Sequence, residues 1–255
     1  MNWRGEEVWQ AVAPLVPGFT VEILPEVDST NTELMRRARG GRIEPVLLVA
    51  ESQTAGRGRL GRSWASAAGD SLTFSLGLPL APQDWSGLSL AVGVAIAEAL
   101  HPLVRIKWPN DLWVGGRKLG GILIETANSA PADAQGPRYA VIGIGINVRV
   151  PAAAGYSIAP APLDELLPGV EAGDALARIA RPLVDAVKGF ESFGFAPFHT
   201  RFDARDVLRD RGVLLSDGRS GTAHGTTDQG GLLVHTASGM ATITSNEVSV
   251  RPAAL

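Results

Sequence analysis

Glycines and arginines alternate in one segment of the chain, residues 51–64, which reads E-S-Q-T-A-G-R-G-R-L-G-R-S-W. Arginine presents a rigid fork of N–H donors that matches carboxylate and phosphate oxygens. Glycine lets the backbone approach a ligand closely and adopt positive φ without steric cost. The segment is therefore suited to fold over a small anion. Its candidate groups are Gly56, Arg57, Gly58, Arg59, Gly61, Arg62 and Trp64.

Three interpretations of this Arg/Gly segment compete. It fits a hinge exposed to water, a nucleic-acid contact loop of the kind that becomes ordered on RNA, and a phosphate clamp in an enzyme. A P-loop is excluded, because no Gly-Lys-Ser/Thr follows the glycines and no helix is expected to start after them. The rest of the chain must decide among the three.

Lysine is rare in this chain and its positions are informative. Of 23 basic residues only three are lysines, Lys107, Lys118 and Lys188, and two of them fall within twelve residues. An ammonium is a compact point charge, so a lysine kept where arginine is the rule can be required for chemistry. This points to residues 107–118 as a second functional segment.

The composition is that of an ordinary globular protein, with 255 residues, 45% apolar and 19% charged. No apolar run is long enough to span a membrane and no signal-peptide pattern begins the chain, so we predict a cytoplasmic protein without a membrane partner. Cysteine is absent, which excludes disulfides and thiolate metal sites. A net charge of −3 argues against a dedicated nucleic-acid binder.

Polar residues also gather at residues 28–33, D-S-T-N-T-E, between an expected strand over 21–25 and an expected helix. Thr30 and Glu33 fit a capping box, which predicts a helix that runs from there to residue 40. The first four residues of this stretch would offer hydroxyl, amide and free backbone N–H groups at a strand-to-helix turn.

The remaining pattern predicts a mixture of strands and helices. The strand over 71–78 alternates and should be half-buried. Gly143 and Gly145 suggest a ligand lying against their strand, and no helix follows them, so a dinucleotide-binding fingerprint is excluded. We predict strands at 45–51, 71–78, 104–108 and 139–148, a hairpin over 112–126, and helices within 1–20 and at 86–100, 172–193 and 196–208.

The pattern changes after residue 211 to short strands with turns at 217–218 and 229–231. This is about the length of a small five-stranded barrel. We therefore predict two domains, residues 1–209 and residues 210–255.

Five motifs occur in an order that resembles one family. They are D-S-T-N, Q-x-x-G-R-G-R-x-G-R-x-W, K-W-P-N-D, R-K-L-G-G-I-L-I-E and G-I-G-I-N-V. Over residues 20–150 they resemble biotin protein ligase, also called biotin–acetyl-CoA-carboxylase ligase. The resemblance implies an α+β fold, with a mixed sheet of the class II aminoacyl-tRNA-synthetase type, helices, and a small C-terminal SH3-like β-barrel. Leu60 departs from the pattern, because many relatives carry a basic residue there.

The resemblance also implies an ATP-dependent ligase that works in two steps. Biotin and Mg-ATP give biotinyl-5′-AMP and pyrophosphate, and the acyl group then moves to a lysine of a biotin carboxyl carrier domain. That partner is usually acetyl-CoA carboxylase, or another biotin-dependent carboxylase. The first step brings a carboxylate to an α-phosphate, so cations must neutralise their repulsion. By the resemblance, the catalytic groups are Lys118, Arg57, Arg59 and Asp111.

Ligand contacts are carried over from the family residue by residue. The residues expected to bind biotin are Ser29, Thr30, Asn31, Gln53, Arg57, Gly58, Arg59, Lys118, Gly121 and Gly145. Those expected to bind ATP are Arg59, Arg62, Trp64, Asn110, Asp111, Lys118 and Asn147. Asp111 is also expected to hold Mg²⁺, which favours a carboxylate together with phosphate oxygens. Lys107, Trp108 and Trp113 are expected to be structural.

An acyl-phosphate anhydride hydrolyses in water, so we expect residues 55–69 to be open when empty and closed over ligand. About 20 residues precede the first expected strand, too few for the winged helix-turn-helix with which some relatives repress biotin genes. We therefore predict no nucleic-acid partner. Relatives often pair their sheets edge to edge, which leaves a homodimer open.

Two alternative functions stay open. A lipoate or octanoate ligase shares the broad fold and a lysine at the carboxylate, but it lacks the need to bind a ureido ring and the G-R-G-R-x-G-R segment. An RNA-binding module could use the Arg/Gly segment, although the net charge of −3 and the lack of an aromatic stacking surface count against it.

Overall fold

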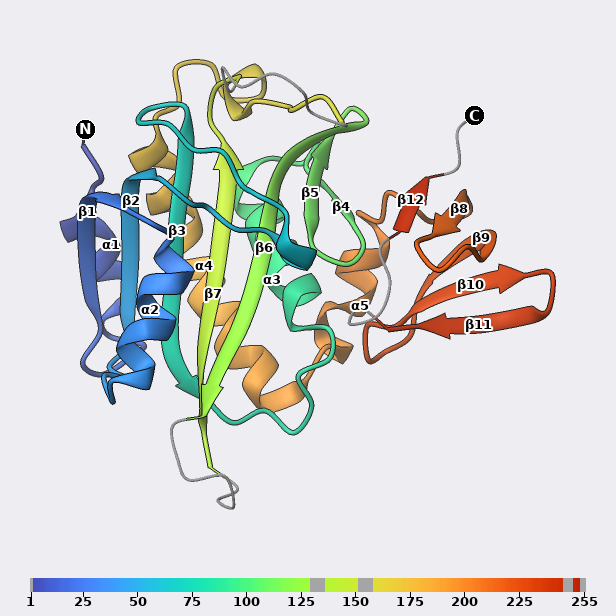
Figure 1. The fold of residues 1–255 in the computed structure, drawn as a ribbon, viewed down its shortest axis with the longest axis horizontal. Helices are drawn as coiled ribbons and strands as arrows, with labels where there is room; N and C mark the ends of the chain where they lie inside the picture. Colours follow the sequence, from blue (N-terminus) through green and yellow to red (C-terminus); the bar gives the residue numbers. More distant parts are fainter. Residues whose placement is uncertain (1, 129–135, 151–157, 245–249, 253–255) are drawn as a thin grey trace.

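A seven-stranded sheet forms the centre of the protein, which is described by a computed structural model over residues 2–128, 136–150, 158–244 and 250–252. The strand order is β1-β2-β3-β7-β6-β5-β4 (Figure 1). β1 and β2 run parallel, and each later pair in this order is antiparallel. The strands are β1 (Thr20–Val27), β2 (Val46–Gln53), β3 (Ser71–Leu80), β4 (Arg105–Lys107), β5 (Asp111–Val114), β6 (Arg117–Asn128) and β7 (Arg138–Asn147).

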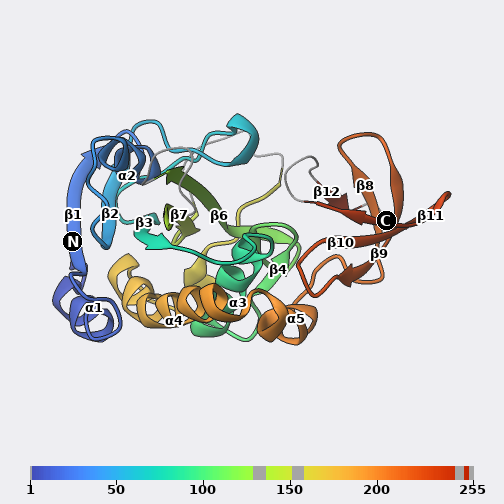
Figure 2. The ribbon, with the colours of Figure 1, turned by 90° about the horizontal axis from the view of Figure 1, so that it is seen from below.

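Helices cover both faces of this sheet (Figure 2). Helices α1, α3, α4 and α5 lie on one side, and α2 lies on the other with the segment that follows β2. Among the described helices, none is both long and apolar enough to cross a bilayer. The helices are α1 (Gly5–Val12), α2 (Thr30–Arg39), α3 (Leu88–Leu100), α4 (Ala172–Phe193) and α5 (Ala196–Asp203).

Strand β3 is buried at every position except Pro79. The alternation of residues 71–78 predicted a half-buried strand, and that prediction is wrong because the polar side of β3 faces α2 instead of water. Ser75, for example, contacts side chains of that helix and is fully buried. Burying hydroxyls is tolerated only when they are hydrogen-bonded, so this face must carry a polar network.

Helix α2 is capped by Ser29, whose side chain accepts a hydrogen bond from the backbone N–H of Thr32 at 3.5 Å. A capping box centred on Thr30 is therefore wrong by one residue. The Thr30 hydroxyl contacts Gln53 and Ser75 instead, which leaves it no capping role. The Thr30 hydroxyl, which the sequence pattern assigned to the helix end, is therefore hydrogen-bonded in the interior of the protein.

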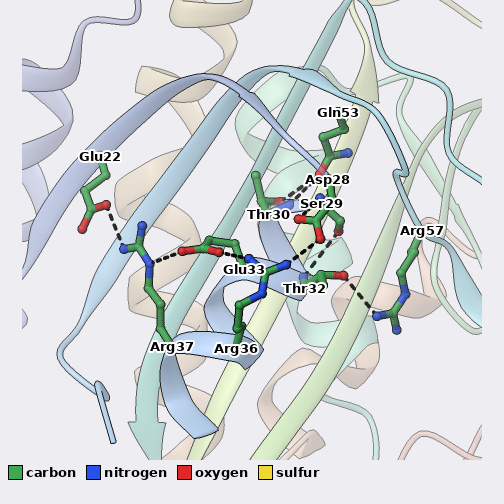
Figure 3. Close-up of polar contacts among 10 residues, drawn as sticks. All are labelled: Glu22, Asp28, Ser29, Thr30, Thr32, Glu33, Arg36, Arg37, Gln53 and Arg57. Carbon is green, nitrogen blue, oxygen red and sulfur yellow. Dashed lines mark hydrogen bonds and ion pairs between the residues drawn. The ribbon is translucent and has the colours of Figure 1, made fainter. Parts of the chain in front are cut away.

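Ion pairs fix α2 against the edge strand β1. Arg37 pairs with Glu33 of its own helix at 2.8 Å and with Glu22 of β1 at 2.8 Å (Figure 3). The Arg37 side chain is largely buried. Burial alone would lower the pKa of Arg37, but hydrogen bonds to the two carboxylates outweigh this effect and the pKa is raised. The last turn of α2 is thereby held against the start of β1.

A second sheet of five antiparallel strands follows, in the order β11-β10-β9-β8-β12. The predicted number of strands is confirmed, whereas the predicted domain boundary at residue 209 stays a prediction. The buried indole of Trp108 donates to the carbonyl of Gly230 at 3.0 Å and so ties the two sheets together. The strands are β8 (Gly212–Leu215), β9 (Ser220–Thr226), β10 (Leu232–Thr236), β11 (Gly239–Ile243) and β12 (Val250–Pro252).

Helix α5 ends at Asp203, short of the predicted residue 208. The reason is that the chain leaves the helix to lie along β4. The backbone N–H of Ile106 donates to Arg205 at 2.9 Å, and the N–H of Val207 donates back to Ile106 at 2.9 Å. Residues that could have continued a helix are used to extend the central sheet.

This junction buries a carboxylate. Asp206 is 7% exposed; its Oδ1 accepts from the Leu208 N–H at 2.8 Å, while Oδ2 has no hydrogen-bond partner among the described residues. Burial is the main reason that the pKa of Asp206 rises to about 6. Folding therefore shifts the equilibrium of Asp206 toward the protonated carboxyl, which predominates below about pH 6.

We expect Asp206 to make stability fall as pH rises. Its pKa increases on folding from 3.8 to about 6, so the folded state binds the extra proton and its advantage is lost through that window. Between about pH 4.5 and about pH 7.5 the loss should be about 2 kcal/mol. In urea denaturation, Asp206→Asn should lack this component, so its stability relative to wild type should rise over the same range. A difference between the two proteins that does not change with pH would contradict this assignment.

Candidate active site

The structure brings all of the predicted site residues to one cavity of about 320 Å³. The cavity lies on the α2 side of the sheet, beneath the segment that follows β2. Its predicted members are Ser29, Thr30, Asn31, Gln53, Arg57, Gly58, Arg59, Arg62, Trp64, Asn110, Asp111, Lys118, Gly121, Gly145 and Asn147. Gly143, which the sequence also singled out, lines the cavity too, whereas sequence reasoning missed Thr73, Ile144 and Ile158 of the lining and also Val250, which comes from the second sheet.

The Arg/Gly segment forms a flap, residues 55–69, that crosses in front of the central strands (Figure 1). Its two arms are held together by hydrogen bonds from Gly58 N to Arg62 O at 2.7 Å and from Trp64 N to Gly56 O at 2.8 Å. A Cβ at Gly56 would lie 2.4 Å from the carbonyl oxygen of Trp64, so only glycine permits this closure. The tip is Leu60, with a left-handed φ of 56° and 63% exposure.

Arg57 attaches the flap to the body of the protein. Its guanidinium donates to the Thr32 hydroxyl at 3.2 Å (Figure 3) and pairs with Glu125 of β6 at 2.6 Å. Sequence reasoning did not single out Glu125, although the R-K-L-G-G-I-L-I-E motif ends on it. One arginine thus joins the flap to both α2 and β6.

Asp111 lies between two lysines. Its Oδ1 is 2.6 Å from Lys118 Nζ, and its Oδ2 is 3.7 Å from Lys107 Nζ. The tight β4–β5 hairpin sets this arrangement, because Lys107 and Asp111 are directly opposed in its register. Lys107 ends its strand as predicted, but it also lines the cavity.

Positive charge exceeds negative charge around this aspartate. Burial lowers the pKa of Lys107, and Lys118 and Arg62 lower it further, while Asp111 acts in the opposite direction. Burial likewise lowers the pKa of Arg59, with Arg62 adding to the effect. A depressed cation pKa means that the charged form lacks full compensation. An anion bound in this cavity would supply it.

The amide of Asn110 orients part of this cluster. Its Nδ2 donates to the carbonyl of Ile122 at 2.7 Å, and its Oδ1 accepts from Arg59 at 3.4 Å. Asn147 donates from its amide to the backbone carbonyl of Lys118 at 3.1 Å. Both amides therefore support cationic residues, and their predicted contacts with ATP stay predictions.

The glycines of β7 make room for side chains of this protein. A Cβ at Gly143 would lie 2.1 Å from Asn31 Oδ1, and one at Gly145 would lie 2.5 Å from the indole ring of Trp64. The structure places Asn31 and Trp64 beside these glycines, and both glycines also line the cavity, so the expected ligand contact stays a prediction. The indole N–H of Trp64 is buried and has no hydrogen-bond partner among the described residues. Its predicted contact with adenine stays a prediction.

The far end of the cavity is neutral and polar. The carboxamide oxygen of Gln53 accepts from the Thr30 N–H at 2.8 Å (Figure 3), and the Thr30 hydroxyl contacts Ser75 at 2.7 Å. Sequence reasoning missed Ser75. The signal was present, because Ser71, Thr73 and Ser75 alternate along one side of β3.

The cavity can therefore hold an elongated ligand with a neutral hydrogen-bonding head and an anionic end. Thr30 and Gln53 offer hydrogen-bonding groups at one end, and Lys118, Arg59 and neighbouring cations occupy the other. Within the described ranges, no group of three or more His, Cys, Asp or Glu residues could hold a metal ion by itself.

Comparison with known proteins agrees with this geometry. Residues 24–147 match the Biotin/lipoate A/B protein ligase family, and residues 213–251 match the biotin protein ligase C-terminal domain. The bifunctional ligase/repressor BirA of Escherichia coli K12 is 35% identical over 247 residues, covering 92% of this chain and 75% of that protein. A biotin–acetyl-CoA-carboxylase ligase of Paracoccus denitrificans is 31% identical over 245 residues, covering 89% of this chain and 98% of that protein. The chain belongs to the biotin protein ligase family.

Solved structures of this family share the fold. Biotin protein ligase from Aquifex aeolicus, in complex with biotin and ATP, matches with a TM-score of 0.76 and 29% identity, covering 91% of this chain and 99% of that one. The expectation of an α+β fold with a small C-terminal β domain is confirmed. The roles of individual cavity residues stay predictions.

We expect Glu125→Gln to loosen the flap. The substitution removes the carboxylate that holds Arg57, which is a partly exposed ion pair worth at most about 1 kcal/mol. Without ligand, trypsin should then cleave after the flap arginines roughly 3-fold faster than in wild type. The measurement is the initial rate of fragment formation, followed by mass spectrometry.

Glu165→Gln provides the matched control, because it removes an exposed ion pair with Arg117 that lies outside the flap. Cleavage within residues 57–62 should stay at the wild-type rate in this variant. Equal flap cleavage in the two variants would show that Glu125 does not hold the flap.

Proposed function

We propose that the cavity binds biotin and ATP side by side, with the biotin ring near Thr30 and Gln53 and the reacting oxygens near Lys118. The observation that carries this proposal is the excess of cationic side chains around Asp111, with Lys107 buried and Lys118 half-buried, beneath an arginine flap and next to a neutral polar pocket. A ureido ring needs both donors and acceptors, and a carboxylate meeting a phosphate needs cations.

The chain is an ATP-dependent ligase, as its family membership shows. It activates biotin as biotinyl-5′-AMP and transfers the biotinyl group to a lysine of a carrier protein. In the first step a biotin carboxylate oxygen attacks the α-phosphorus of ATP. The bond from that phosphorus to the bridging oxygen breaks, and pyrophosphate leaves.

Lys118 is the group we assign to this first step. Its Nζ can contact the carboxylate and the α-phosphate together and stabilise the charge of the transition state. Arg57 and Arg59 would approach the same oxygens from the flap, and Arg62 would face the remaining phosphates. Asp111 keeps Lys118 in place through their 2.6 Å contact.

Asp111 and Asn110 are the oxygen donors of this site that would hold Mg²⁺ together with the ATP phosphates, and the bound ion would supply further neutralisation of those phosphates. Both Asp111 oxygens contact lysine ammonium groups in this structure, so the phosphates would have to bring the negative charge that admits the cation. The single carboxylate suits Mg²⁺, because this ion commonly binds through one or two carboxylates plus substrate phosphates rather than in an all-protein cage.

In the second step the amine of a carrier lysine attacks the biotinyl carbonyl carbon. The bond to the phosphate oxygen of AMP breaks, and the amine loses a proton. The partner is a biotin carrier domain of a carboxylase, and we propose that of acetyl-CoA carboxylase. Closure of the flap would protect the anhydride from water until that partner arrives.

Lipoate is the nearest alternative substrate, since the matched family includes ligases for both acids. Biotin is favoured because the relatives that match most of this chain are biotin ligases and because the pocket near Thr30 is polar. In an ATP–pyrophosphate exchange assay, unlabelled biotin should compete and lipoate should not. An RNA-binding role is disfavoured because Arg59 is partly buried and lines the cavity together with Arg57 and Arg62.

We expect Lys118→Ala to abolish biotinylation. With biotin and ATP, the wild-type protein should add one biotinyl group to a carrier domain, which mass spectrometry detects. The rate of this reaction should be at least about 100-fold lower for the variant, because the variant lacks a preorganised cation that stabilises the transition state.

Lys188→Ala is the control, since this lysine lies on the surface of α4 and pairs only with Glu191 among the contacts described. Its rate should equal that of wild type. Full adenylation activity in Lys118→Ala would show that the assigned role is wrong.

A further inference from the structure

Three fully buried polar side chains form a continuous chain behind the neutral end of the cavity. Asn31 and Thr30 of α2 are each 3% exposed, and Ser75 of β3 is 0% exposed. Ser75 Oγ lies 2.7 Å from Asn31 Oδ1 and 2.7 Å from Thr30 Oγ1. Each of these hydroxyls carries only one proton, so the direction of the hydrogen bonds can be worked out.

Asn31 sets the starting point. Its Nδ2 lies 3.1 Å from the carbonyl oxygen of Leu123 and 2.9 Å from Glu125 Oε2, and both of these groups only accept. The amide must therefore turn its two protons toward them. Its oxygen faces Ser75, and that oxygen has no proton to give.

The direction then passes along the chain. Ser75 must donate its single proton to Asn31 Oδ1, because the amide oxygen can only accept. The 2.7 Å contact between Ser75 and Thr30 consequently needs the Thr30 proton, with Thr30 donating and Ser75 accepting. After these two bonds, neither hydroxyl has a proton left.

The other contact of Thr30 does not change this result. Its hydroxyl also lies 3.2 Å from Gln53 Oε1, which is long for an O–H···O bond. If the proton turned toward Gln53, the two hydroxyl oxygens would face each other at 2.7 Å with no proton between them. The shorter contact therefore takes the proton, and Gln53 Oε1 is satisfied by the Thr30 N–H.

We propose that Ser75, oriented by Asn31, makes the Thr30 hydroxyl an obligate acceptor and so selects ligands that present an N–H to it. Thr30 lines the cavity and keeps lone pairs available, whereas Ser75 acts through it as a positioning residue. This inference rests on the proposed biotin site, and it adds the residue that determines the polarity of the contact with one ureido N–H.

Cyclic carbamate analogues of biotin test this inference, because each replaces one ureido nitrogen with oxygen at nearly constant shape. For the wild-type enzyme, KM for one of the two carbamate isomers should be roughly 10- to 100-fold higher than KM for biotin. The reason is that the ring oxygen of this isomer and the Thr30 hydroxyl would be two acceptors facing each other. The value of kcat should change less than about 2-fold, because this ring is remote from the reacting carboxylate.

Ser75→Ala removes the hydroxyl that takes the Thr30 proton, so Thr30 can turn and donate. The preference for biotin over that isomer should fall to less than about 3-fold, with KM for biotin itself raised about 10-fold and kcat retained. Thr30→Ser keeps the hydroxyl and should retain the wild-type preference. Melting temperatures establish that each variant is folded.

Ser71→Ala is the matched control. It removes another buried hydroxyl from the same side of β3, one that contacts the backbone of Ala67 at 3.2 and 3.3 Å and does not line the cavity. The preference of this variant for biotin over the carbamate should remain within about 2-fold of wild type, even if its stability falls.

Two results would overturn the inference. One is a wild type that does not distinguish biotin from either carbamate, and the other is a Ser75→Ala variant that keeps the full preference. A wild type that forms no biotinyl-5′-AMP from biotin would instead refute the proposed function, so the two failures are distinguishable.

Discussion

Uncompensated positive charge beneath the flap is the constraint on which the site depends. Asp111 stands between Lys107 and Lys118, and the three are held at that spacing by a tight hairpin and the neighbouring strand β6. One carboxylate cannot fully neutralise two ammonium groups, so burying this cluster without a bound anion is electrostatically unfavourable. Binding of anionic substrates removes this electrostatic cost. The same cations then neutralise the groups that react, so substrate binding and chemistry depend on one cluster.

The two ends of the cavity are built by different means. Charged residues come from the flap and from β4–β6, where backbone register sets their distances. The neutral end is instead formed where the start of α2 packs on β3, and its side chains are fixed by mutual hydrogen bonds. The predicted closure of the flap would therefore bring its arginines to the reacting groups without disturbing the hydrogen-bonded part that recognises the ligand.

Sequence predicted most strands, and it predicted which residues share the cavity, because strong motifs end on the sheet. It failed where tertiary contacts override local preference. The sequence pattern predicts that Thr30 caps a helix, but its hydroxyl is hydrogen-bonded to Ser75. The pattern of β3 predicts a half-exposed strand, but α2 covers its polar side. Ser75 itself was missed, because the alternation of Ser71, Thr73 and Ser75 marks a polar side of the strand but does not say whether water or a helix will cover it.

Val250 of β12 gives the cavity a wall from the second sheet, far along the chain from every other lining residue. During synthesis, a ribosome-bound chain that stops before this strand would have its central sheet but an unfinished pocket. Substrates that contact this wall would bind the growing chain less tightly than the folded protein, so the stabilisation that binding provides would reach its full value only once β12 is in place.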